Sequence, residues 1–183
     1  MSSSFLTPSI GPQDHVYGNE NAVIELVEYG DYQCPYCGRA YPIIKNIQEQ
    51  LGSALRFGFR NFPLSKVHPN AFDAAVAAEA AALQGKFWEM HDIIFENQHS
   101  LELGNIVQLA RSIGLNTDRF KEDLQLPAVI GKVKSDFESG VRSGVNRTPS
   151  FFINGNLYTG DWQGVVLLEY LKNQLPHRLN GQL

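Results

Sequence analysis

A β-rich apolar run that leads directly into a cysteine-containing helix start is the feature that most constrains this chain. Residues 23–29 read Val-Ile-Glu-Leu-Val-Glu-Tyr, a nearly continuous apolar run typical of a central strand covered on both faces. After a turn at 30–33 comes Cys34-Pro35, and proline suits the first helical position because its missing N–H has no helical partner there. We therefore expect a strand, a tight turn and a helix that begins at the cysteine.

The next elements follow from periodicity. The helix that starts at Cys34 should reach about residue 50, and the aromatic alternation of 55–62 predicts a strand parallel to the first one. Helical spacing across 64–142, with a dense alanine stretch near its start, predicts four or five helices. Residues 1–20 are rich in Ser, Pro, Gly and Asn, which predicts a mostly irregular lead-in.

The β pattern returns near the end of the chain. Residues 150–153 predict a strand, Asn154-Gly155 is a strong two-residue hairpin signal, and 156–159 should form the returning strand. Asp161 is placed to cap a final helix over 162–175. The whole order is βαβ, a helical block, then ββα.

Composition and charge exclude several classes of protein. The chain has 183 residues, 43% of them hydrophobic and 19% charged, which suits one globular domain or one domain with an insertion. A formal net charge of −4 without a basic stripe argues against nucleic-acid binding. The longest aliphatic run, 165–168, is far shorter than the ~20 residues that a membrane span needs.

The compartment is expected to be cytoplasmic for the sequence as given. The first Lys or Arg is Arg39, so the basic start of a signal peptide is absent. If the native N-terminus was removed, a periplasmic or extracellular location is the alternative. We expect a monomer.

The number and spacing of the cysteines say most about the chemistry of this chain. The chain has two cysteines, Cys34 and Cys37, and a bridge that closes so small a loop stabilises a fold by only about 2 kcal/mol. At the start of a helix, unpaired N–H groups and the helix dipole favour an anion, so the Cys34 thiolate should be stabilised, with a pKa in roughly the 4–7 range. Cys37 lies one turn further on the same face and should be more buried. We expect Cys34 to be the exposed sulfur that forms a mixed disulfide and Cys37 to resolve it.

A Cys-x-x-Cys pair also has two other uses. A zinc site needs four ligands, and the five histidines show no pair at zinc-finger spacing, so we expect no metal. Two inert core thiols are the second alternative. A Cys-x-x-Cys motif beside a βαβ pattern favours redox chemistry over both.

Two stretches resemble a known family. Residues 28–37, Glu-Tyr-Gly-Asp-Tyr-Gln-Cys-Pro-Tyr-Cys, and residues 147–155, Arg-Thr-Pro-Ser-Phe-Phe-Ile-Asn-Gly, resemble the DsbA-like branch of thiol–disulfide oxidoreductases in the thioredoxin superfamily. The resemblance implies an α/β thioredoxin-like fold with a central mixed sheet, formed by 1–63 and 143–183. An inserted all-helical domain at 64–142 would interrupt it.

The resemblance also implies roles for individual residues. Pro149 matches the cis-proline beside the redox cysteines, and Thr148 would contact the sulfurs and a bound peptide. Glu28 matches the buried acid beneath the disulfide, where burial raises a carboxyl pKa and allows proton exchange with Cys37. Glu25 is the competitor if the strand register differs. Apart from the resemblance, His68-Pro69 opens a predicted helix, and His68 is interpreted as its cap rather than as a base.

Pro35 and Tyr36, between the cysteines, would tune the redox potential. The strong oxidants of this branch carry a histidine where this chain has Tyr36, so a less oxidising couple is expected. Pro-Tyr is also the glutaredoxin dipeptide, which keeps open a glutathione-dependent reductase with glutathione as co-substrate. No other cofactor is expected.

The predicted function is dithiol–disulfide exchange with thiol- or disulfide-containing proteins, and a separate redox partner resets the pair. A non-catalytic peptide-binding module is the alternative from another class. The sequence leaves the net direction open.

Overall fold

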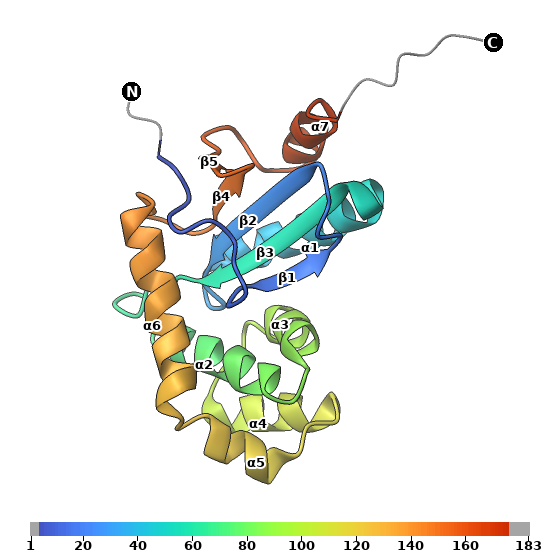
Figure 1. Ribbon diagram of the computed structural model, residues 1–183. Helices are drawn as coiled ribbons and strands as arrows, with labels where there is room; N and C mark the ends of the chain where they lie inside the picture. The colour runs from blue at the N-terminus through green and yellow to red at the C-terminus, as the bar shows by residue number, and fades with distance from the viewer. Residues whose placement is uncertain (1–3, 176–183) are drawn as a thin grey trace, which may run out of the picture.

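A five-stranded mixed sheet forms the centre of the computed structural model, which describes residues 4–175 (Figure 1). The strands are β1 (His15–Gly18), β2 (Ile24–Gly30), β3 (Leu55–Asn61), β4 (Ser150–Ile153) and β5 (Asn156–Leu157). Their spatial order is β1-β3-β2-β4-β5. β2 and β3 are parallel and the other neighbours are antiparallel, which confirms the predicted mixed sheet.

Helices cover the sheet and form a separate layer beside it (Figure 1). They are α1 (Pro35–Leu51), the short 3₁₀ helix η1 (Gly52–Ala54), α2 (Ala71–Ala82), α3 (Phe87–Glu96), α4 (Leu103–Ser112), α5 (Thr117–Asp123), α6 (Pro127–Arg142) and α7 (Val166–Lys172). Helices α2–α6 all fall between β3 and β4 in the chain. The predicted helical block is therefore confirmed.

The alternation of side chains along β2 explains its continuous apolar sequence. Ile24 and Leu26 belong to the larger apolar cluster, which includes the inner face of α1, whereas Val27 and Tyr29 belong to a second cluster on the opposite face. Both faces of the strand are therefore covered, as expected for a central strand. The same alternation places Glu28 on the side of Leu26, beneath α1.

Helix α6 links the helical layer to the sheet. It contacts both α2 and β3, and a Cβ at Gly140 would lie 2.6 Å from Cδ2 of Phe62 and 3.1 Å from Cδ1 of Tyr29. The missing side chain thus permits the close approach of the helix to the sheet. The larger apolar cluster runs through both parts of the molecule, so the domain limits 1–63, 143–183 and 64–142 stay a prediction. Residues 1–3 and 176–183 of those ranges lie outside the described part.

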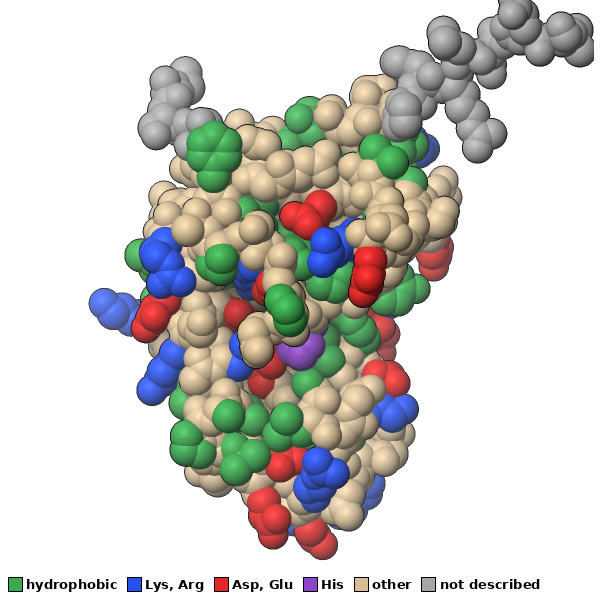
Figure 2. All heavy atoms as spheres, in the orientation of Figure 1, with side chains coloured by type: hydrophobic (Ala, Val, Ile, Leu, Met, Phe, Trp, Pro, Cys, Tyr) green, Lys and Arg blue, Asp and Glu red, His purple; other side chains and the backbone are tan. Residues whose placement is uncertain are grey.

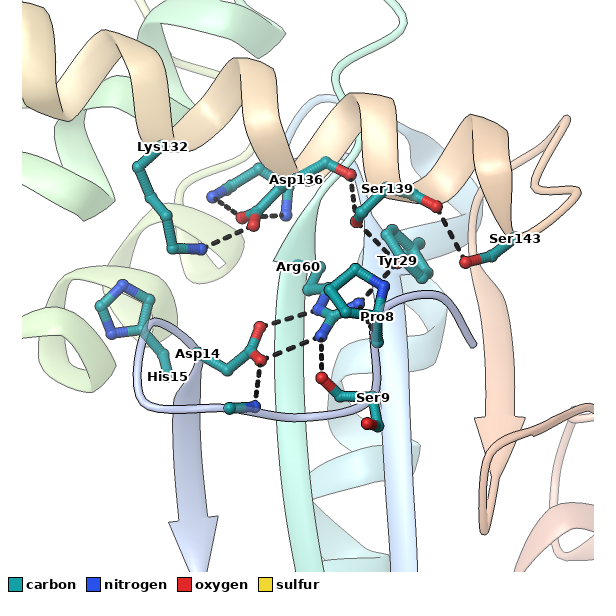
Figure 3. A network of polar contacts seen from close by, with 12 residues as sticks. Pro8, Ser9, Asp14, His15, Tyr29, Arg60, Lys132, Asp136, Ser139 and Ser143 are labelled. Carbon is teal, nitrogen blue, oxygen red and sulfur yellow. Dashed lines mark hydrogen bonds and ion pairs between the residues drawn. The ribbon is translucent and has the colours of Figure 1, made fainter. Parts of the chain in front are cut away.

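A polar network joins the N-terminal segment to β2, β3 and α6 (Figure 3). The Arg60 guanidinium bonds Asp14 with two nitrogens, at 2.7 and 2.9 Å, and donates to the Tyr29 hydroxyl at 2.9 Å. That hydroxyl lies 2.8 Å from the Ser139 hydroxyl on α6. On the face shown in Figure 2, Lys and Arg side chains alternate with Asp and Glu.

The prediction that residues 1–20 are mostly irregular was wrong at β1. His15–Gly18 pairs antiparallel with β3, because the outer edge of β3 offers backbone donors and acceptors. The local sequence pattern of residues 15–18 does not report this pairing with a distant strand.

The end of the chain also differs from the prediction. The returning strand is only Asn156–Leu157, and the last helix begins at Val166, not at 162. Asp161 Oδ1 accepts the Gln163 N–H in a turn and caps no helix. Gly164 has a φ of 57°, a left-handed conformation that interrupts the helical path before α7.

Candidate active site

The two cysteines lie where β2 turns into α1. Cys34 is the N-cap of α1, with extended dihedral angles of φ −70° and ψ 122°, and Pro35 follows it as the first helical residue. Both are free thiols. Cys37 is fully buried and Cys34 is only 4% exposed, so the expectation of an exposed Cys34 was wrong in degree. The loop at Thr148 covers it, with Sγ of Cys34 3.5 Å from the Thr148 carbonyl oxygen.

The Cys34 thiolate is stabilised by several donors. A hydrogen bond from the Cys37 thiol is the largest influence, and burial opposes it. The Thr148 hydroxyl and the backbone N–H groups of Tyr36 and Cys37 add to it, and together they lower the pKa of Cys34 from 9.0 to about 5. This falls within the range predicted for a helix N-terminus.

The Cys37 thiol has the opposite character. Burial raises its pKa well above the ordinary value, and its hydrogen bond to Cys34 and the charges of Glu28 and Cys34 add to the rise. The Asp31 N–H, 3.4 Å from its sulfur, opposes the rise without cancelling it. The pair therefore combines one acidic sulfur with one sulfur that holds its proton.

Glu28 is the buried acid near the pair. It is 3% exposed, and its Oε1 has no hydrogen-bond partner among the described residues. Burial, and secondarily the charge of Cys34, raise the pKa of this carboxyl to about 8. Glu25, the competitor in the sequence, instead forms a half-buried ion pair with Arg56 at 3.4 Å.

The Thr148–Pro149 loop lies against the cysteines, and its peptide bond is cis, which confirms the predicted conformation. The Thr148 hydroxyl is buried, lowers the pKa of the Cys34 thiol, and has no other hydrogen-bond partner among the described protein groups. It is therefore free to donate to a sulfur anion.

Tyr36 is the exposed residue between the cysteines. Its ring is 55% exposed, and the Arg39 guanidinium lies over it at 4.4 Å from the ring centroid. The tyrosine itself carries no charge, but the arginine places a cation near the helix start.

The interpretation of His68 as a helix cap was wrong. Helix α2 begins after Asn70, and Nδ1 of His68 lies 2.8 Å from Oδ2 of Asp31. Sequence reasoning gave no role to Asp31, although an Asp in a turn frequently accepts the backbone N–H two residues further on, as Asp31 does from Gln33. It also passed over Gln98, whose Nε2 donates to the Cys34 carbonyl oxygen at 2.8 Å. No local pattern marks that residue, since α3 brings it there.

A groove of about 670 Å³ opens beside the cysteines. Tyr36, Thr148 and Pro149 lie on one part of its wall, and residues 157–163 form another. Its wall mixes polar groups such as Arg147 with aromatic ones such as Trp162.

Comparison with known proteins identifies this arrangement. The model of a family described as thioredoxin matches residues 11–172. A thioredoxin-like oxidoreductase from Silicibacter pomeroyi is 27% identical, with a TM-score of 0.78 over 90% of this chain and 91% of that one. BdbD from Bacillus subtilis is 24% identical and shares the fold, with a TM-score of 0.80 over 95% and 98% of the two chains.

The curated relatives are longer proteins. A Na(+)/H(+) antiporter NhaA 1 from Mycobacterium sp. (strain KMS) is 40% identical over 162 residues, which are 87% of this chain and 26% of that protein. The chain thus spans about a quarter of the length of these relatives. Within residues 4–175, none of the helices has the length and apolar character to cross a bilayer. The chain belongs to the thioredoxin family.

Proposed function

We propose that the chain exchanges its cysteine pair with cysteines of protein substrates through a mixed disulfide at Cys34. In the oxidising direction, a substrate thiolate attacks Sγ of Cys34 in the Cys34–Cys37 disulfide, and Cys37 leaves as a thiolate. A second substrate thiolate then attacks the substrate sulfur of the mixed disulfide. The substrate disulfide forms, and Cys34 leaves as a thiolate. The same steps in reverse reduce a disulfide.

The difference between the two sulfurs is the observation that carries this proposal. The pKa of Cys34 is lowered to about 5 and that of Cys37 is raised. A low pKa makes Cys34 the better leaving group and the sulfur that is ionised at neutral pH. Cys37 needs a proton when it leaves the disulfide.

Glu28 is the proposed source of that proton. Its pKa of about 8 keeps it protonated at neutral pH, and its free Oε1 is available to pass a proton to Cys37. A cavity of about 40 Å³, lined by Glu28, Tyr41, Lys45 and His91 among others, is large enough for a water that restores it.

The groove at Thr148 supports a polypeptide substrate. It has a volume of about 670 Å³ and is lined by Tyr36, Pro149 and Trp162 among others, which suits a polypeptide segment around the reacting cysteine. A glutathione-dependent reductase, with glutathione as the small co-substrate, is the alternative enzyme, and a passive peptide-binding module is the non-catalytic alternative.

We propose a monomer as the acting unit and a separate redox partner that resets the pair. Ion transport, which the names of the longer relatives state, is not proposed because the matched region is the thioredoxin fold.

The acidic Cys34 favours the reduced state of the couple, while Tyr36 supplies no charge of its own. We therefore expect a potential between about −270 mV, the value of thioredoxin, and about −120 mV, the value of DsbA. Equilibration with glutathione buffers measures this potential.

We propose a cytoplasmic location, where such a couple stays reduced; in a periplasmic or extracellular setting it stays oxidised. Trapping the thiols by alkylation in intact cells distinguishes these states.

Paired cysteine variants test the function. Cys37→Ser should accumulate a mixed disulfide with a reduced, unfolded protein substrate, and Cys34→Ser should form none. Retained turnover of glutathionylated substrate by Cys37→Ser would favour the glutathione-dependent alternative. Unchanged substrate binding by Cys34→Ala, with no exchange in the wild type, would favour the passive module.

A further inference from the structure

The helical insertion contacts both polar backbone groups of Cys34. One contact reaches the Cys34 N–H through Asp31, and the other reaches the Cys34 carbonyl directly from Gln98. The two contacts come from different parts of the insertion, the segment before α2 and the segment after α3.

On the N–H side, Asp31 collects four donors around a side chain with no solvent exposure. Its Oδ1 accepts the N–H of Gln33 at 2.8 Å and of Cys34 at 3.1 Å. Its Oδ2 accepts the N–H of Leu64 at 2.8 Å and lies 2.8 Å from Nδ1 of His68. A carboxylate only accepts, so His68 carries the proton on Nδ1. Each oxygen thus serves a different part of the fold: Oδ1 holds the cysteine turn, and Oδ2 is held by the insertion.

On the carbonyl side, Gln98 shares the Cys34 oxygen with the helix itself. Its Nε2 donates at 2.8 Å, and the Gly38 N–H donates at 3.0 Å. A Cβ on Gly38 would overlap Oε1 of Gln98. The glycine therefore makes room for this contact.

We propose that His68 and Gln98 are positioning residues through which the insertion holds Cys34 in its reactive geometry. This inference rests on the proposed function and deepens it. Holding both the N–H and the C=O of one residue sets the direction of its Cα–Cβ bond, which limits its sulfur to the few staggered positions about that bond. The contacts of the sulfur with Cys37 and Thr148 then select one of them. Thiol–disulfide exchange requires an aligned approach of sulfurs, and small misplacements of a reacting group slow reactions disproportionately.

A glycine substitution separates positioning from folding. Gly38→Ala should displace Gln98 while it favours the helix, because Ala has the higher helix propensity. Gln98→Ala removes the same contact by another route. If both act through one hydrogen bond, adding Gly38→Ala to Gln98→Ala should cause no further loss. Gly131→Ala is the matched control, since its Cβ in α6 meets no atom within 4 Å.

Three measurements report on the position of the Cys34 sulfur. Each of the two variants should slow exchange by about two- to tenfold, the worth of one hydrogen bond, in kcat with KM for the substrate little changed. The thiolate absorbance of the reduced protein should titrate at a shifted pH. Thermal melting should be unchanged or higher for Gly38→Ala.

His68 is tested by conservative rescue. His68→Ala removes the donor to Asp31 and should slow exchange and shift the thiolate titration. His68→Asn keeps a donor close to the position of Nδ1 and should restore both. Equal loss in both variants would overturn the role of His68.

Other outcomes are equally decisive. Folded Gln98→Ala, Gly38→Ala and His68→Ala variants with wild-type rates and titrations would overturn the proposal. A cumulative loss in the Gly38→Ala/Gln98→Ala pair would also do so. If the wild type shows no exchange at all, the proposed function fails, while the thiolate titration still measures the positioning of Cys34.

Discussion

The Sγ of Cys34 lies 3.5 Å from the backbone oxygen of Thr148, next to a threonine hydroxyl that has no other partner among the described protein groups. The two oxygens suit different states of the sulfur. Of these two oxygens, the carbonyl accepts a hydrogen bond from a thiol, whereas the hydroxyl donates one to a thiolate. The loop therefore offers one partner to each protonation state of Cys34.

Thr148→Val tests this relationship. The hydroxyl lowers the pKa of Cys34, and valine keeps the shape but donates nothing, so the pKa should rise by about one unit. Titration of thiolate absorbance in the reduced protein measures it. Thr159→Val, at an exposed position of the same groove, serves as the control. An unchanged titration in Thr148→Val would show that the hydroxyl does not reach the thiolate.

The pH dependence of alkylation should show one acidic sulfur. With a Cys34 pKa of about 5, the alkylation rate of the reduced protein should rise through that pH and stay constant to neutral pH. Cys37 should not contribute because its pKa is raised. Cys37→Ala removes the largest stabilising hydrogen bond and should move the midpoint upward. A midpoint near the ordinary value of 9.0 in the wild type would contradict the geometry.

Glu28→Gln should stabilise the fold at neutral pH while it slows exchange. The folded carboxyl, with a pKa of about 8, stays protonated where the unfolded one, near 4.5, has ionised. The wild type therefore loses stability as pH rises through this window, and Gln does not. At pH 7 the gain should be on the order of 3 kcal/mol, measured by urea unfolding.

The control for that variant is Glu25→Gln, on the same strand but half-buried and paired with Arg56. It should leave the exchange rate nearly unchanged and should not reproduce the stabilisation expected of Glu28→Gln. Parallel stability profiles for wild type and Glu28→Gln would mean that Glu28 is ionised in the fold.

Arg60→Met should destabilise the protein without changing the reactivity of Cys34 and Cys37. Arg60 is 2% exposed, and its guanidinium pairs with Asp14 (Figure 3). Removing it leaves a carboxylate with little access to water, which costs about 3–5 kcal/mol. Denaturant unfolding measures this loss. Lys172→Met, which breaks only an exposed pair with Glu169, should change stability by less than about 0.5 kcal/mol. A similar effect of the two substitutions would contradict the importance of the buried pair.

The sequence by itself determined the elements whose signals are local. The continuous apolar run of β2 predicts a strand covered on both faces, and Cys34-Pro35 predicts the start of α1. Asn154-Gly155 predicts its hairpin because both residues adopt the positive φ that such a turn requires, 48° and 80°. These features depend on neighbours in the chain, so the chain alone reveals them.

Only the tertiary structure decided the features that depend on distant partners. β1 forms because the outer edge of β3 is open for a strand to pair with it. Glu28 is buried, and Glu25 is not, because of the register of β2 in the sheet. His68 and Gln98 meet the Cys34 turn from segments 34 and 64 residues further along the chain. Periodicity reports which face of an element is apolar, but it carries no information on which polar side chain the fold brings to a given backbone group.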